Sequence, residues 1–112
     1  MASAPTLRMT VDRSGPDVVL RLIGEADIAT ADRLRGRLRD LVAPGRPDAV
    51  RRLVVDASQL SFLDLVALDA LLAAAADVRE REGVLVLRAP TRRVRRLLSV
   101  LSIGDRLPVV PA

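Results

Sequence analysis

The 112-residue sequence has no cysteine and no histidine. These absences exclude disulfide frameworks, thiol nucleophiles and every mechanism that needs an imidazole. The only aromatic residue is Phe62, so the chain lacks the stacking surfaces that single-stranded nucleic acids require. Lysine is also absent, and the 18 basic residues, all arginine, give a formal net charge of +4. An all-arginine, alanine-rich composition can reflect a GC-rich genome, and we expect no nucleic-acid partner.

Long apolar runs are missing as well. A membrane helix needs ~20 apolar residues, and Asp64, Asp69 and Asp77 interrupt the longest candidate. Residues 1–5 lack the basic and apolar regions of a signal peptide. We therefore expect a cytoplasmic protein with no direct membrane insertion.

The apolar pattern that is present predicts one α/β domain over residues 1–112. It predicts strands at 7–12, 17–23, 51–56 and 84–88, a loop at 58–63 and an edge strand near 107–110. It predicts helices from Thr30 to a stop at 44–47, over 64–82 with Gly83 as C-cap, and from Pro90-Thr91 to Gly104. Strands joined through helices imply a mixed sheet of four to five strands, with 53–56 central and about three to four helices packed on it.

Four segments, spanning about residues 17–110, resemble the STAS domain of anti-sigma factor antagonists. They read LIGEADIATADRL (22–34), LVVDASQLSFLD (53–64), GVLVLRAP (83–90) and VRRLLSVLSIGDRLPVV (94–110). STAS domains occur as anti-sigma factor antagonists, as stressosome scaffold subunits and as cytoplasmic parts of transporters. The resemblance implies an anti-sigma factor, itself a serine kinase in some cases, as partner.

The resemblance also implies where the partner binds, namely the loop after the second strand and the head of the second long helix. The residues at these positions are Glu25, Asp27, Asp64, Leu65, Val66, Ala67 and Asp69. In the family the helix-head aspartate is followed by Ser-Ser/Thr-Gly-Leu, and the second hydroxyl is phosphorylated by the partner kinase. That acceptor position falls on Val66, which has no hydroxyl. We therefore expect no phosphorylation at this helix.

Neighbouring polar residues have simpler structural interpretations. Ser58 and Ser61 are expected to make local hydrogen bonds, although either could replace the missing acceptor. Thr30 is expected to cap a helix, and Asp27 and Asp64 suit a turn and an N-cap as well as a partner site.

The paired carboxylates also resemble acid–base or metal sites, but the sequence supplies neither a nucleophile nor a set of ligands. We expect no enzymatic activity, metal or cofactor. Arginines at 92, 93, 95 and 96 indicate either a solvated helix face or a landing site for an acidic partner.

The sequence thus predicts an anti-sigma factor antagonist-like regulator that competes with the sigma factor and lacks the usual phosphorylatable serine. The alternatives are a STAS subunit of an ABC-type transporter and a stressosome-like scaffold subunit. The partner's identity, the controlling signal and the oligomeric state, including a homodimer, stay open.

Overall fold

The computed structural model describes residues 7–43 and 50–111. The described residues form, in order, β1 (Leu7–Ser14), β2 (Asp17–Ala26), α1 (Ala31–Leu41), β3 (Arg52–Leu63), α2 (Leu65–Glu80), β4 (Val84–Arg88), α3 (Arg92–Leu101) and β5 (Val109–Val110). The predicted mixed α/β sheet is confirmed. No helix within the described ranges combines the length and apolar character needed to cross a bilayer.

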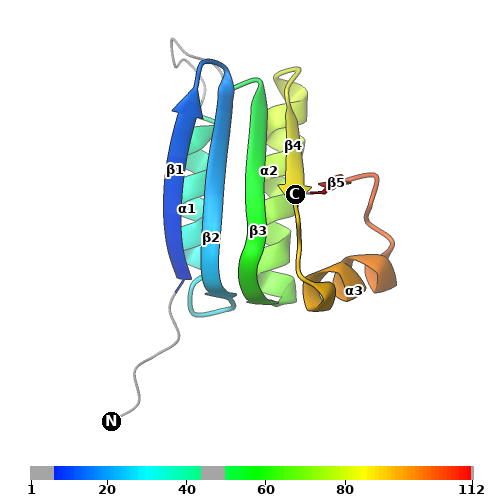
Figure 1. Ribbon diagram of the computed structural model, residues 1–112. Coiled ribbons are helices and arrows are strands. Elements are labelled where there is room, and N and C mark those ends of the chain that lie inside the picture. Colours follow the sequence, from blue (N-terminus) through cyan, green and yellow to red (C-terminus); the bar gives the residue numbers. More distant parts are fainter. Residues whose placement is uncertain (1–6, 44–49, 112) are drawn as a thin grey trace.

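The strands lie in the order β1-β2-β3-β4-β5, so β3 is central as predicted. β1 and β2 form an antiparallel hairpin, whereas β2, β3, β4 and β5 are mutually parallel. Gly15 has φ +62° in the hairpin turn, a conformation that glycine adopts without strain. In Figure 1, α1 and α2 lie behind the sheet, and α3 lies at its lower right. The carboxyl ends of the parallel strands therefore meet at the lower edge.

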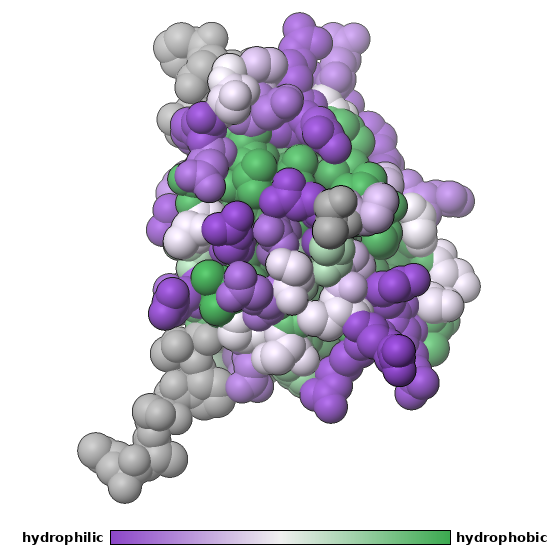
Figure 2. All heavy atoms as spheres, in the orientation of Figure 1, coloured by the Kyte–Doolittle hydropathy of each residue, from purple (hydrophilic) through white to green (hydrophobic). Residues whose placement is uncertain are grey.

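The core lies between the sheet and its covering helices. Leu20, Val55 and Leu87 sit side by side on neighbouring strands and are fully buried. From α2, Leu68 and Leu71 are buried in the same cluster, and the partly buried Leu72 packs against it. Because strand side chains alternate between faces, the next row points away from α1 and α2. That open face carries both apolar and charged residues (Figure 2).

The predicted loop at 58–63 is wrong, because β3 continues to Leu63. Two register shifts, between Arg21 and Ile23 and between Gly24 and Glu25, let the longer β3 stay paired with β2. Bulges of this kind break the alternation of polar and apolar residues, which made a paired strand resemble a loop. For the same reason β2 continues to Ala26, three residues beyond the predicted strand at 17–23.

The end of α2 also differs from the prediction. The residue in the left-handed conformation is Glu82, with φ 62°, and the Gly83 N–H donates to the Val78 carbonyl at 2.9 Å. This is a Schellman-type ending with glutamate at the position that usually holds glycine. Gly83 is required for a different reason, since a Cβ there would lie 2.8 Å from both the Arg51 oxygen and Val78 Cγ1. The predicted stop of the first helix at 44–47 lies outside the described residues.

Candidate partner-binding surface

The two predicted site segments meet at the carboxyl edge of the parallel strands. β2 and β3 end in register, with Ala26 beside Leu63. The Asp64 N–H then donates to the Ala26 carbonyl at 3.0 Å, which joins the loop after β2 to the head of α2. Residues nearly 40 positions apart in sequence thus form one continuous surface.

Asp27 holds the loop after β2 in shape. Its Oδ1 accepts from the N–H groups of Ala29 at 3.0 Å and Thr30 at 3.1 Å. The Thr30 hydroxyl donates to the Glu25 carbonyl at 3.1 Å and accepts from the Asp27 N–H at 3.0 Å. Thr30 stands at the N-cap position of α1, but its side chain makes no capping hydrogen bond. The predicted cap is therefore wrong, because the hydroxyl is engaged by the preceding loop.

Asp64 caps the head of α2, as predicted. Its Oδ1 accepts from the Ala67 N–H at 2.9 Å and satisfies one of the free donors of the first turn. Ala67 is fully buried, so its methyl group cannot contact a partner as the sequence interpretation assumed. Helical periodicity explains this, because Ala67 points to the same side as the buried Leu71 four residues later.

Three apolar side chains are exposed on this surface. Leu65 is 61% exposed and Val66 is 39% exposed, in line with their predicted place, and Ile28 is 74% exposed. The sequence analysis did not include Ile28 in the site. A large apolar residue in a loop, directly after Asp27, could have indicated an exposed contact residue. We call the group Glu25, Asp27, Ile28, Asp64, Leu65, Val66 and Asp69 the edge surface.

Both candidate replacement serines make local hydrogen bonds. The Ser58 hydroxyl donates to Asp56 Oδ1 at 2.8 Å, and the Ser61 hydroxyl donates to the Gly24 carbonyl at 3.0 Å. Both side chains are exposed on β3 rather than on a loop. These contacts agree with the structural role expected for them.

A charged cluster on the open face of the sheet escaped the sequence analysis. Arg21, Asp56 and Arg88 are aligned across β2, β3 and β4, and Asp56 Oδ2 lies 3.3 Å from Arg21 Nε and 3.0 Å from an Arg88 terminal nitrogen. Burial by itself raises the pKa of Asp56. Hydrogen bonds from the Ser58 N–H and hydroxyl and from the two arginines outweigh it and lower the pKa from 3.8 to about 2. Asp56 is thus a structural carboxylate and lies outside the edge surface.

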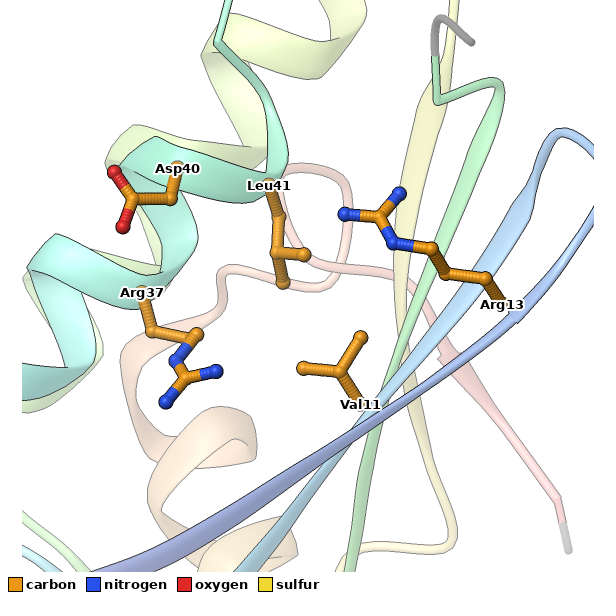
Figure 3. Close-up of a pocket in the computed structure, with 5 residues that line it drawn as sticks. All are labelled: Val11, Arg13, Arg37, Asp40 and Leu41. Atoms are coloured by element: carbon orange, nitrogen blue, oxygen red, sulfur yellow. The ribbon is translucent and has the colours of Figure 1, made fainter.

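The hollow between β1 and α1 offers little chemistry. A shallow groove of about 500 Å³ between β1 and α1 has Val11 and Leu41 at its centre, with Arg13 and Arg37 on either side (Figure 3). Within the described residues, no group of three or more acidic side chains is placed to hold a metal ion.

The comparisons with known proteins agree with the fold. The sequence model described as "Mlab, STAS domain" matches residues 9–111. The chain belongs to the STAS domain family. No curated protein matches this STAS chain significantly.

Several solved structures are similar to the STAS chain. An anti-sigma factor antagonist from Mycobacterium paratuberculosis is 27% identical with a TM-score of 0.84, covering 99% of this chain and 92% of that one. The phosphorylated form of the Bacillus cell fate determinant SpoIIAA is 23% identical with a TM-score of 0.69, covering 97% and 91%. The murine Slc26a9 anion transporter is 16% identical with a TM-score of 0.74, covering 90% of this chain and 17% of that one. The last two share the fold alone.

Proposed function

We propose that this protein is an anti-sigma factor antagonist that binds an anti-sigma factor through the edge surface and so releases a sigma factor for transcription. The observation that carries the proposal is the similarity to the mycobacterial antagonist, which extends over nearly the whole of both chains. The protein would act in the cytoplasm, as one STAS domain, by binding rather than by catalysis.

The edge surface has the composition of a binding site. Ile28, Leu65 and Val66 supply apolar contact area, and burial of such side chains in a complex contributes roughly 25 cal/mol per Å² before the costs of association. The edge surface also carries the carboxylates of Glu25, Asp27, Asp64 and Asp69, which suit a partner with basic side chains and favour rapid association.

The phosphorylation switch would not operate at α2. A phosphate at a helix N-terminus gains from the free N–H groups and the helix dipole and carries about −1.5 to −2 charge. Val66 offers no oxygen to accept it, and Ala67 is buried. We propose that the protein is unswitched at this site and is controlled by its abundance or by another ligand.

The test uses purified anti-sigma factors of the source organism, each measured against the wild-type chain by calorimetry. We expect one of them to bind and to release its sigma factor. Val66→Asp and Ile28→Asp should each weaken binding at least tenfold, about 1.4 kcal/mol. Asp27→Asn removes the charge yet keeps the oxygen that holds the loop, and should also weaken binding.

Ala76→Asp and Asp77→Asn, at exposed positions in the second half of α2, are the matched controls and should bind like the wild type. Unchanged affinity for all three edge variants would move the interface elsewhere. Binding to no anti-sigma factor would refute the proposal.

The second candidate is a STAS subunit of a transporter. The observation that favours it is the murine anion transporter, in which the same fold occupies a small part of a longer chain. Purified ABC-transporter ATPases of the organism, measured in parallel, distinguish the two functions. A stressosome-like scaffold role would instead appear as binding to other STAS proteins.

A further inference from the structure

Helix α3 presents charge that nothing in the described chain neutralises. Val94 and Leu98 on its inner side are buried, whereas the four arginines of its first turns are exposed. No acidic side chain of the described residues forms an ion pair with these arginines, which are Arg92, Arg93, Arg95 and Arg96. In Figure 2 strongly hydrophilic residues gather at the lower right, where α3 lies in Figure 1.

Two hollows meet at Arg95. One, of about 600 Å³, runs along the outer side of α3 past Arg92 and Arg96 to Val100, which is 74% exposed. The other, of about 250 Å³, lies between the start of α3 and the tail, and apart from Arg95 its lining is apolar (Ala89, Pro90, Val109, Val110, Pro111). A ligand that fits both hollows would combine carboxylates with small apolar groups.

This basic helix begins at the same edge of the sheet as the edge surface. The Thr91 hydroxyl accepts from the Val94 N–H at 3.4 Å as the N-cap and donates to the Leu60 carbonyl on β3 at 3.2 Å. Leu60 lies three residues before the end of β3, where the edge surface begins. One edge of the molecule therefore has an acidic, apolar half and a basic half.

We propose that α3 docks an acidic, partly apolar segment of the same protein partner that binds the edge surface, so that recognition is bipartite. The inference rests on the proposed function. The combination of acidic and basic groups along this edge favours a protein partner over a nucleic acid or a lipid surface. An extended nucleic acid lying along this edge would meet the carboxylates of Asp27, Asp64 and Asp69. A lipid bilayer would need a broad apolar face on α3, but Val94 and Leu98 of its apolar stripe are buried in the core.

The experiment measures association with the anti-sigma factor that binds the wild type, by surface plasmon resonance at low and high NaCl. The test variant is the double substitution Arg92→Glu/Arg96→Glu. The matched control is Arg51→Glu/Arg52→Glu, exposed arginines at the start of β3 on the opposite edge. Each double reversal takes the formal net charge from +4 to zero, so the overall attraction changes equally.

We expect the α3 variant to associate at least tenfold more slowly than the control at low salt, with the gap closing at high salt. Circular dichroism should show both variants folded. Equal rates for the two variants would refute the α3 site and leave the edge surface intact, whereas a wild type that binds no anti-sigma factor would refute the proposed function and this inference with it.

Vesicles of phosphatidylcholine and phosphatidylglycerol and a DNA duplex serve as further probes. Binding of either through α3, with association to the anti-sigma factor unchanged, would also overturn the inference.

Discussion

Replacing Asp56 by asparagine tests the charged cluster of the open sheet face. The substitution keeps the shape and an acceptor for Ser58 but removes the charge that Arg21 and Arg88 share. The fall in pKa from 3.8 to about 2 corresponds to at most about 2.4 kcal/mol. Since the side chains of Arg21 and Arg88 are 40% and 32% exposed, water screens part of this interaction. We expect Asp56→Asn to lower the free energy of unfolding by about 1–2 kcal/mol at pH 7.

The pH dependence gives the sharper test. Because the pKa is lower in the folded than in the unfolded state, charged Asp56 stabilises the fold above about pH 4 and loses this effect as the pH falls towards 2. Urea unfolding of wild type and variant from pH 7 to pH 2.5 should therefore show a difference that shrinks with acidity. Asp77→Asn, an exposed aspartate on α2, is the control and should stay within about 0.5 kcal/mol of wild type throughout. A difference for Asp56→Asn that is independent of pH would contradict the ion-pair explanation.

Two further predictions concern packing and the missing phosphate acceptor. Gly83→Ala should lower the free energy of unfolding by about 1–3 kcal/mol, because the added Cβ meets the Arg51 oxygen and Val78. Gly36→Ala, in the open interior of α1, should instead raise it by about 0.5–1 kcal/mol; equal effects in urea unfolding would contradict this. With an anti-sigma kinase and ATP, intact mass should show no phosphate at 64–69 in the wild type, little in Val66→Ser, and more in Leu65→Ser/Val66→Ser/Ala67→Gly. A wild-type phosphate on Ser58 or Ser61 would show that the switch has moved into β3.

The sequence alone determined the order of the elements and approximately where each one begins. Each of those features depends on neighbours within a few residues: the Val, Leu and Ile content of the strand at 17–23, the helical spacing of Leu68 and Leu71, and the capping side chains of Asp64 and Thr91. Local hydrogen bonding and periodicity are readable without knowing the tertiary partners. The four collinear segments that resemble STAS domains added the location of the edge surface.

Only the tertiary structure decided the rest. The extension of β3 to Leu63 depends on bulged pairing with β2, and the Arg21–Asp56–Arg88 cluster joins residues 35 and 32 positions apart in sequence. Thr30 was predicted to cap α1, but its hydroxyl binds the preceding loop because the Glu25 carbonyl lies within hydrogen-bonding distance. Ala67 is buried, and Ile28 exposed, by how α2 and the loop after β2 sit against the sheet. These outcomes follow from contacts between distant segments, and no local pattern of residues encodes which segments will meet.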